Sequence, residues 1–459
     1  MLTDPADTAP FLKDYRRRWG DEALAVVQPD STADVAAVVR WCRTHGHAVV
    51  PQGGNTGLTG AGVPGQPPRP TVLLSLTRMQ HVRQVDPINN TMVVDAGCTL
   101  LAAQQAAEAH GRLFPLSLAS EGACTVGGNL ATNAGGVQVL RYGNMRELCL
   151  GLEVVTADGE IWDGLTALRK NNTGYDLRDL FIGSEGTLGV ITGAVLKLFP
   201  RPAGRAVAMA GLDSPTQALA LLAHAQSRLA GELTAFELIS SAAMALVLKH
   251  IPGNRPPLAR ACDWYVLLET SSLHSDMAAR AGLEAMLAEA LEQSLLNDVT
   301  VATSITQARQ LWALRENISA AQTAEGRNIK HDISVPVSGI DDFIRQADEA
   351  IHAAHPQARL IVFGHLGDGN LHFNVAPGAH HASAYDEDFV RMEARINRIT
   401  HDVVAAHRGA ISAEHGIGVL RRDELPRYKQ PVEMRLMRAI KAALDPDNRM
   451  NPGKLLAAD

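Results

Sequence analysis

Two histidines in one short segment are the first candidates for chemistry. Residues 361–375 read IVFGHLGDGNLHFNV, with His365 and His372 on either side of Asp368-Gly369. Because Asp-Gly is a favoured two-residue turn, the segment predicts a hairpin in which the two histidines face each other. Directly opposed Cβ atoms lie about 5 Å apart, so both imidazoles could bind one metal ion. The other pairs expected in this register are Gly367 with Asn370, Leu366 with Leu371 and Phe363 with Asn374.

A second segment, ISAEHGIG at residues 411–418, offers a third ligand and a base. Its Glu414 and His415 are adjacent, and adjacent side chains rarely point the same way. We therefore expect Glu414 to complete a site of two histidines and one carboxylate, with His415 acting as a base. Asn374, two residues beyond His372, is expected on the same face of its strand. Imidazole and carboxylate suit zinc, manganese and iron alike, so the residues alone do not identify the metal.

Glycine-rich segments indicate a site of another kind. The first, PQGGNTGLTG at residues 51–60, follows a hydrophobic strand-like run, the second spans residues 122–136, and a smaller cluster lies at residues 183–193. In such loops backbone N–H groups can converge on a phosphate, although each loop alone is equally explained as a turn region. The first loop has neither a Gly-Lys-Ser/Thr ending nor a Gly-x-Gly-x-x-Gly opening a helix, which excludes the common ATPase and Rossmann motifs.

The elements that position these groups follow from the hydrophobic pattern. The first 200 residues predict an α+β domain, with short strand-like runs and two amphipathic helices. Two prolines at residues 200 and 202 indicate a boundary, and Ala/Leu-rich helices alternating with short strands follow it. Strands are expected at residues 48–50, 72–76, 91–94 and 152–155, and helices at residues 34–45, 100–110, 214–230, 275–296 and 340–354.

Composition narrows the class of protein. The 459 residues, 46% of them hydrophobic, allow two or three domains. The 42 Lys and Arg against 49 Asp and Glu give a net charge of −7, which argues against a nucleic-acid or anionic-membrane partner. No apolar stretch approaches a transmembrane helix and the start, MLTDPADTAP, has no secretory pattern, so we expect a cytoplasmic protein that is not integral to a membrane. The five scattered cysteines include no Cys-x-x-Cys pair and are expected to be buried, reduced thiols.

Three ordered motifs resemble the FAD-dependent enzymes of the vanillyl-alcohol oxidase and p-cresol methylhydroxylase (PCMH) family. They lie at residues 51–60, at residues 127–136 (GGNLATNAGG) and at residues 172–189 (NTGYDL to SEGTLG), and the closing NPGK at residues 451–454 resembles the family's return to the flavin. The resemblance implies an α+β fold: a PCMH-type FAD-binding domain of two α/β subdomains at residues 1–203, a cap domain with an antiparallel sheet at 204–410, and a C-terminal segment at 411–459 that completes the active site and the FAD site.

The same resemblance implies how FAD is held. Members with covalent FAD use a His or Cys, whereas the first loop here offers Asn55 and Thr56, so we expect non-covalent FAD. The contacts are expected to be mostly backbone. The expected FAD-binding residues are Pro51, Gln52, Gly53, Gly54, Asn55, Thr56, Gly57, Leu58, Gly122, Thr125, Gly127, Gly128, Asn129, Thr132, Asn133, Gly135, Gly136, Glu185, Gly186, Gly189, Ile191 and Asn451.

The histidine segments narrow the resemblance to FAD-linked D-2-hydroxyacid dehydrogenases, most closely the D-2-hydroxyglutarate dehydrogenase branch. This implies that His365, His372 and Glu414 bind a catalytic metal, zinc with manganese as the alternative. It also implies that His415 acts on the substrate hydroxyl, as a general base that contacts the substrate.

Substrate carboxylates require cationic partners. Residues 312–319 read as one helix, which would place Arg315 and Ser319 on the same face, and Lys330 comes at the start of an expected strand. By composition alone these would be surface charges. In the hydroxyglutarate branch an Arg, a hydroxyl residue one turn later and a Lys contact the substrate, and the lactate and glycolate branches lack that Lys. The resemblance therefore implies that Arg315, Ser319 and Lys330, together with Asn374, bind the substrate, with Lys330 on the distal carboxylate.

The expected activity is oxidation of D-2-hydroxyglutarate to 2-oxoglutarate, with hydride transfer to flavin N5. One alternative is a D-lactate or glycolate dehydrogenase on the same fold, and another is a non-catalytic FAD-binding subunit, which would need neither the metal set nor the base. Oxygen use by an oxidase also stays open. Expected partners are the hydroxyacid and an electron acceptor such as an electron-transfer flavoprotein or a quinone-linked carrier. The motifs leave the oligomeric state open, with a homodimer as one option.

Overall fold

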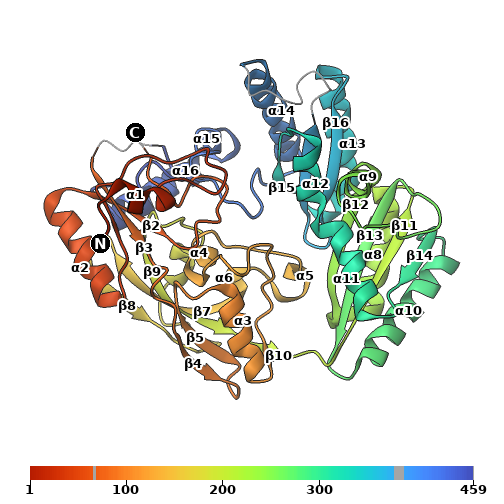
Figure 1. Cartoon of the computed structure of the whole chain (residues 1–459), viewed down its shortest axis with the longest axis horizontal. Helices are drawn as coiled ribbons and strands as arrows, with labels where there is room; N and C mark the ends of the chain where they lie inside the picture. The colour runs from red at the N-terminus through yellow and green to blue at the C-terminus, as the bar shows by residue number, and fades with distance from the viewer. Residues whose placement is uncertain (66–68, 377–386, 458–459) are drawn as a thin grey trace. The chain divides into compact units, whose positions relative to one another are not determined.

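The computed structural model describes residues 1–65, 69–376 and 387–457. The chain divides into two compact units (Figure 1). Unit 1 consists of Met1–Gly136, Tyr142–Arg201 and Glu414–Asp459, and unit 2 consists of Val137–Arg141 and Pro202–Ala413. The last segment of the chain therefore belongs to the same unit as the glycine-rich segments.

The described part of unit 1 contains two main sheets and one short pair of strands. One is parallel with the strand order β1-β3-β2, and the other is antiparallel with the order β4-β5-β9-β7-β8, while β10 pairs with β6. Most residues of β7 and nearly all residues of β9 are buried. The strands are β1 (Ala25–Val27), β2 (Ala48–Gln52), β3 (Thr71–Ser75), β4 (Val82–Asp86), β5 (Thr91–Asp95), β6 (Arg112–Leu113), β7 (Cys149–Thr156), β8 (Ile161–Gly164), β9 (Gly189–Lys197) and β10 (Phe199–Pro200).

Helices of unit 1 begin and end where local signals place them. In the longest helix near the start of the chain, α2, the Ser31 hydroxyl accepts from the N–H of Asp34 and Gly46 ends the helix at φ +70°. The helices are α1 (Pro5–Thr8), η1 (Ala9–Phe11), α2 (Thr32–His45), α3 (Leu100–Ala109), α4 (Val126–Ala131), α6 (Met145–Leu148), α7 (Arg178–Phe181), α15 (Leu425–Tyr428) and α16 (Pro431–Leu444), and α5 (Val139–Tyr142) spans the boundary at residue 142.

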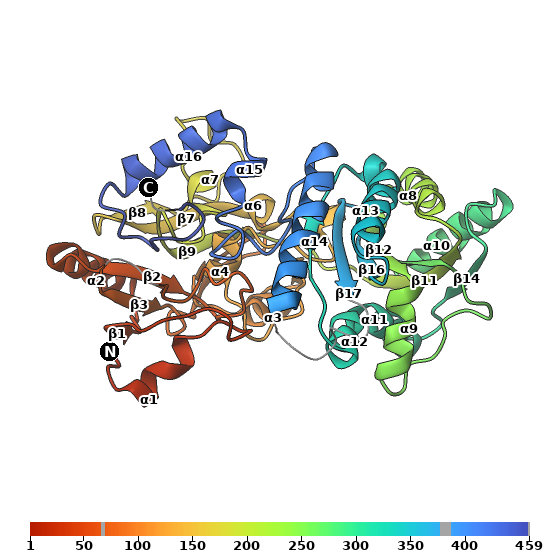
Figure 2. The same ribbon diagram turned by 90° about the horizontal axis from the view of Figure 1, so that it is seen from above.

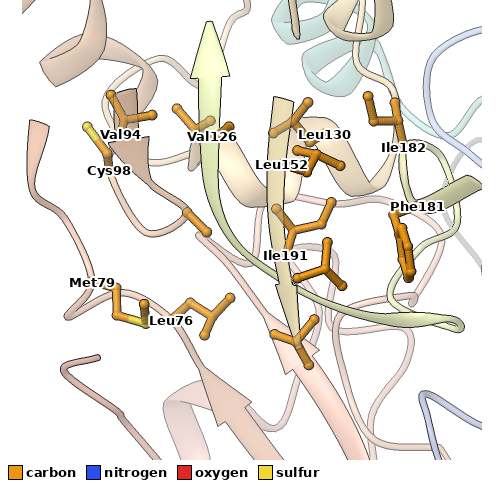
Figure 3. Close-up of a cluster of buried hydrophobic side chains, with 14 of the residues drawn as sticks. Leu76, Met79, Val94, Cys98, Val126, Leu130, Leu152, Phe181, Ile182 and Ile191 are labelled. Atoms are coloured by element: carbon orange, nitrogen blue, oxygen red, sulfur yellow. The ribbon is translucent and has the colours of Figure 1, made fainter. Parts of the chain in front are cut away.

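The core of unit 1 fixes the second glycine-rich segment on the antiparallel sheet. Val126 and Leu130 of α4 belong to the same buried cluster as Leu152 of β7 and Ile191 of β9 (Figure 3). Burying one such side chain stabilises the fold by roughly 1.5–3 kcal/mol. Gly127 makes the close approach possible, because a Cβ there would lie 2.6 Å from Cβ of Ala96. The glycines of this segment thus sit on a rigid support.

Unit 2 is a seven-stranded antiparallel sheet in the order β14-β11-β13-β12-β16-β17-β15, which confirms the expected cap architecture. Helices α8, α10 and α13 lie on one side of it and α9, α11 and α12 on the other (Figure 2). The strands are β11 (Gly204–Leu212), β12 (Leu233–Ser240), β13 (Trp264–Ser272), β14 (Asp298–Val301), β15 (Asp332–Ser334), β16 (Arg359–His365) and β17 (Asn370–Ala376). The helices are α8 (Pro215–Leu229), η2 (Ala230–Glu232), α9 (Ser241–His250), α10 (Asp276–Glu292), α11 (Ile305–Glu316), α12 (Ile318–Glu325), η3 (Val337–Gly339), α13 (Ile340–Ala354) and α14 (Glu387–Ala406).

The structure bears out the elements expected from periodicity. The predicted strands correspond to β2, β3, β5 and β7, and the predicted helices correspond to α2, α3, α8, α10 and α13. Within the described ranges, every helix is too short or too polar to cross a bilayer. In the same ranges four cysteines are buried and Cys262 is partly exposed, and all five are free thiols.

Candidate active site

The three glycine-rich segments meet in unit 1. A Cβ on Gly54 would lie 1.8 Å from the carbonyl oxygen of Ala123, so the first segment packs directly against the second. A Cβ on Gly186, whose φ is +71°, would lie 2.9 Å from Cγ of Pro51, so the third segment packs against the first. Residues with side chains could not approach this closely. The glycines therefore bring together loops that are far apart in the sequence.

A cavity lies among these loops. Its empty space, including the open mouth, is about 970 Å³. The predicted FAD-binding residues that line it are Pro51, Gln52, Gly53, Gly54, Asn55, Thr56, Gly57, Thr125, Gly127, Gly128, Asn129, Thr132, Glu185, Gly186, Gly189 and Ile191. The residues that line it without having been predicted to bind FAD are Asp14, Thr59, Gly60, Ala61, Gly62, Leu76, Ala131, Ser184, Val190 and His415.

Asn451, which is also predicted to bind FAD, supports the wall of the cavity, and so does Lys454, which is not among the predicted residues. Asn451 donates through Nδ2 to the carbonyls of Ala61 at 2.9 Å and Glu185 at 2.7 Å, and so joins the first and third segments. Lys454 donates to the carbonyl of Gly60 at 2.8 Å, and burial lowers the pKa of this lysine to about 8. The predicted residues that do not line the cavity are Leu58, Gly122, Asn133, Gly135, Gly136 and Asn451.

Glu185 is a buried carboxylate of which both oxygens accept backbone hydrogen bonds. The N–H of Ile417 donates to Oε1 and the N–H of Gly418 donates to Oε2, each at 2.7 Å. Burial raises the pKa of Glu185, although these two hydrogen bonds act in the opposite direction. The carboxylate thus holds the backbone that follows His415.

Thr59 holds the same part of the chain. Its hydroxyl donates to the carbonyl of His415 at 3.4 Å, and its own carbonyl accepts from the N–H of Val419 at 2.9 Å. His415 therefore lies on the wall of the cavity, among the glycine-rich loops. A general base must lie within reach of the reacting group, so this position suits the role predicted for His415.

The histidine pair of unit 2 lies on the β16–β17 hairpin, in a register that differs from the predicted one. His365 pairs with Asn370, and Phe363 pairs with His372. The turn is a four-residue loop, because the carboxylate of Asp368 accepts from the N–H of Asn370 and the N–H of Gly369 reaches back to the carbonyl of His365. The predicted pairs of His365 with His372, Phe363 with Asn374, Leu366 with Leu371 and Gly367 with Asn370 are therefore wrong.

The two histidines nevertheless share one face of the sheet. A register shift of two residues leaves every side chain on its original face. His372 is now the diagonal neighbour of His365, with ring centroids 6.0 Å apart, a separation that still lets two imidazoles reach one ion. Asn374 pairs with Ile361 and is buried, and its amide accepts from the N–H of His331.

Glu237 of β12 was not singled out from the sequence. It lies directly opposite His365 in the β12–β16 ladder; Oε1 accepts from His365 Nδ1 at 2.6 Å and Oε2 accepts from Arg315 Nε at 2.8 Å. Burial alone would raise the pKa of Glu237, but the charges of His365 and Arg315 outweigh it and lower the pKa to about 2. An ionised carboxylate only accepts, so Nδ1 of His365 is the donor and Nε2 is the ring nitrogen left for a metal.

The helix expected over residues 312–319 is wrong in one respect. It is interrupted at Asn317, where α11 ends and α12 begins, and the Asn317 side chain donates back to the carbonyl of Ala313. Arg315 is buried, with 8% of its surface exposed, whereas Ser319 is exposed. The two residues therefore do not share one continuous helix face.

Strand β15 lies next to Lys330 in the sequence and binds Ala413, the residue before Glu414. Lys330 precedes this strand by two residues, and Asp332 within it pairs with His372. The N–H of Ala413 donates to the carbonyl of Asp332 at 3.2 Å, and Glu414 is the next residue along the chain. Two imidazoles and a carboxylate are a common donor set for a divalent metal, so the residues fit such an ion.

Two protein-family models match this chain. Residues 201–455 match the family model for FAD linked oxidases, C-terminal domain, and residues 23–164 match an FAD binding domain. The chain belongs to the FAD-linked oxidase family. This confirms the family that the glycine-rich motifs predicted, and with it the FAD cofactor.

Curated relatives of this FAD-linked oxidase carry a more specific name. D-2-hydroxyglutarate dehydrogenase of Xanthomonas citri pv. viticola is 39% identical, over 99% of this chain and 94% of that protein. The mitochondrial D-2-hydroxyglutarate dehydrogenase of Bos taurus is 38% identical, over 99% of this chain and 81% of that protein. The branch inferred from the histidine segments is therefore confirmed.

Solved structures show the same fold at low sequence identity. p-Cresol methylhydroxylase superposes with a TM-score of 0.74 at 15% identity, over 99% of this chain and 94% of that one. 4-Ethylphenol oxidase from Gulosibacter chungangensis has a TM-score of 0.73 at 20% identity, with the same coverage. The PCMH-type fold expected for the FAD-linked oxidase is thus confirmed.

Proposed function

We propose that this FAD-linked oxidase oxidises D-2-hydroxyglutarate to 2-oxoglutarate. The observation that carries the proposal is the arrangement within unit 2, where Arg315, a cation suited to a carboxylate, shares the buried Glu237 with His365 of the histidine pair. A cation for a substrate carboxylate and a metal ligand are thus held by one side chain. Relatives named D-2-hydroxyglutarate dehydrogenase that align over 99% of the chain support the choice of substrate.

The cavity of unit 1 is the proposed place of FAD, held without a covalent bond. Backbone groups of glycine-rich loops dominate its wall, as suits a pyrophosphate. Among the described residues that line it, His415 is the one imidazole, and the first loop has Asn55 and Thr56 where covalent members have a His or Cys. When bound, FAD supplies at N5 the acceptor for the hydride that leaves C2 of the substrate.

His365, His372 and Glu414 are the proposed ligands of a divalent metal, zinc or alternatively manganese. Because Nδ1 of His365 is hydrogen-bonded to Glu237, Nε2 of the same ring is the nitrogen that would hold the metal. When bound, such an ion would lower the pKa of an oxygen acid that it coordinates, as it does for water.

The remaining steps belong to side chains. His415 takes the proton of the substrate hydroxyl, so that loss of one proton and one hydride turns the C2 alcohol into a ketone. Arg315 and Lys330 bind the carboxylates and fix the carbon skeleton, and Ser319 and Asn374 add hydrogen bonds. An external acceptor, such as an electron-transfer flavoprotein or a quinone-linked carrier, then reoxidises the flavin.

Lys330 provides the test of the substrate. Lys330→Met should lower kcat/KM for D-2-hydroxyglutarate by roughly 10- to 100-fold, because a charge-assisted hydrogen bond contributes about 1.5–3 kcal/mol. D-lactate has no distal carboxylate, so its kcat/KM should change little. Lys170→Met, at an exposed lysine of unit 1, is the matched control. An equal loss for both substrates would contradict the hydroxyglutarate assignment.

A further inference from the structure

Glu237 takes no part in the chemical steps proposed above, yet it contacts two residues that do. We propose that Glu237 is a positioning residue that holds the metal ligand His365 and the substrate-binding Arg315 in place at the same time. The inference rests on the proposed function, which assigns His365 to the metal and Arg315 to the substrate.

The first argument is the division of the carboxylate between two partners. The Glu237 side chain is 1% exposed, and those of His365 and Arg315 are 9% and 10% exposed. Oε1 accepts from His365 and Oε2 accepts from Arg315, so neither partner can be lost without leaving part of a buried charge uncompensated. Losing one partner of a buried pair is costly, so each bond constrains its partner.

The second argument concerns the atoms of His365 and Arg315 that remain available after each has bonded to Glu237. Nδ1 of His365 points to Glu237, so metal binding falls to Nε2, and carboxylates in this position raise metal affinity by about 10- to 100-fold in metal sites generally. Arg315 bonds Glu237 through Nε, so its two terminal nitrogens form the edge that binds a carboxylate in bidentate fashion. One carboxylate therefore sets the orientation of both functional groups.

The third argument is that Phe363 contacts both Arg315 and His372. The guanidinium of Arg315 lies 4.9 Å from the ring centroid of Phe363, and Phe363 lies 4.8 Å from the ring centroid of His372. Phe363 therefore connects Arg315 to the second histidine, as Glu237 connects it to the first. Within unit 2 the candidate substrate cation is fixed to both histidines.

A second buried carboxylate provides a matched control. Glu269 of β13 pairs with Ala235, two residues before Glu237 on β12, so the two carboxylates share one sheet face. Glu269 accepts from Trp312 Nε1 at 2.9 Å, and Trp312 lies on α11, as Arg315 does. Both carboxylates thus anchor α11, but the described hydrogen-bond partners of the Glu269 carboxylate, Thr234 and Trp312, are not proposed metal or substrate residues.

The experiment compares Glu237→Gln with Glu269→Gln in the FAD-loaded protein. A glutamine has one acceptor oxygen, and its NH₂ group faces whichever donor the oxygen does not serve. After chelation and dialysis, calorimetric titration with Zn²⁺ should show affinity about 10- to 100-fold weaker in Glu237→Gln. KM for D-2-hydroxyglutarate should rise in the same variant. Glu269→Gln should bind Zn²⁺ like the wild type, even if it unfolds at a lower temperature.

The outcomes separate this inference from the proposed function. Wild-type Zn²⁺ affinity and KM in Glu237→Gln would overturn the inference while leaving the proposed metal site intact. A wild-type protein that binds no Zn²⁺ would overturn both. If Glu237→Gln does not fold, as judged from its flavin spectrum, Glu237→Asp keeps the charge but is too short for both partners. The same losses in Glu237→Asp would support the inference, and wild-type values would overturn it.

Discussion

Gly418 and Glu185 are joined by a 2.7 Å hydrogen bond although 233 residues separate them in the sequence. With the second bond, from Ile417, it fixes the turn that follows His415. Gly416 and Gly418 have φ of +80° and +54° in this turn, a conformation that favours glycine. The position of the proposed base therefore depends on one buried carboxylate and the glycines beside it.

Glu185→Gln should displace this turn, because an NH₂ group, which only donates, would replace one of the two oxygens that accept from the N–H groups of Ile417 and Gly418. Misplacement of a catalytic group by about 1 Å can cost a factor on the order of 100 in rate, and we expect flavin reduction to slow by at least about tenfold. Rapid mixing with D-2-hydroxyglutarate under anaerobic conditions measures this rate. Glu147→Gln, which alters a helix-capping carboxylate of α6, should leave it within about twofold. If Glu185→Gln reduced its flavin at the wild-type rate, the position of this turn would not matter for catalysis.

Gly54→Ala should abolish FAD retention. The added Cβ would lie 1.8 Å from the backbone oxygen of Ala123, so the first two glycine-rich segments would have to separate. The flavin content of the purified variant, read from its absorbance, measures the effect. Gly122→Ala is the control, because a Cβ there meets nothing within 4 Å and Gly122 does not line the cavity. Equal flavin content in the two variants would refute the packing argument.

Lys454 makes stability depend on pH. Burial lowers its pKa to about 8 from an ordinary 10.5, so between these values the unfolded chain binds more protons than the folded one. The folding free energy should therefore become more favourable as pH rises from about 8 to 10.5, by at most about 3 kcal/mol, whereas below pH 8 the cost of burying the charge is fully present. Denaturant unfolding measures the free energy of unfolding of the wild type and of Lys454→Met at about pH 7.5 and pH 10. The value for the wild type should rise relative to that of the variant as the pH rises. A constant difference between the two proteins would argue against a lowered pKa.

Much of the site could be predicted because its residue types are tied to local backbone needs. Gly54 and Gly186 are required where loops touch, so the glycine clusters around them predicted a binding site there. The hairpin of His365 and His372 was predicted with the wrong register, since the Asp368 side chain competes for the backbone and makes a longer turn. The two histidines were still predicted on the same face of the sheet, because a shift of two residues leaves every side chain on its original face.

Other features depend on tertiary contacts that the local sequence does not specify. Glu237 has a signal, a glutamate inside the apolar strand LTAFELIS of residues 233–240, but its partners come from residues 315 and 365. The interruption at Asn317 falls in a sequence with normal helix periodicity, where one side chain bonds back to Ala313. Thr59 was part of a predicted loop, yet its bond to His415 joins residues 356 positions apart.

The most direct test of the proposed reaction is an anaerobic visible spectrum of the FAD-loaded protein. Each of D-2-hydroxyglutarate, L-2-hydroxyglutarate and D-lactate is added in turn, before and after chelation. The proposal predicts that the flavin band bleaches with D-2-hydroxyglutarate in preference to the others, that chelation abolishes the bleaching, and that Zn²⁺ or Mn²⁺ restores it. Bleaching that is faster with D-lactate, or that survives complete removal of the metal, would contradict it.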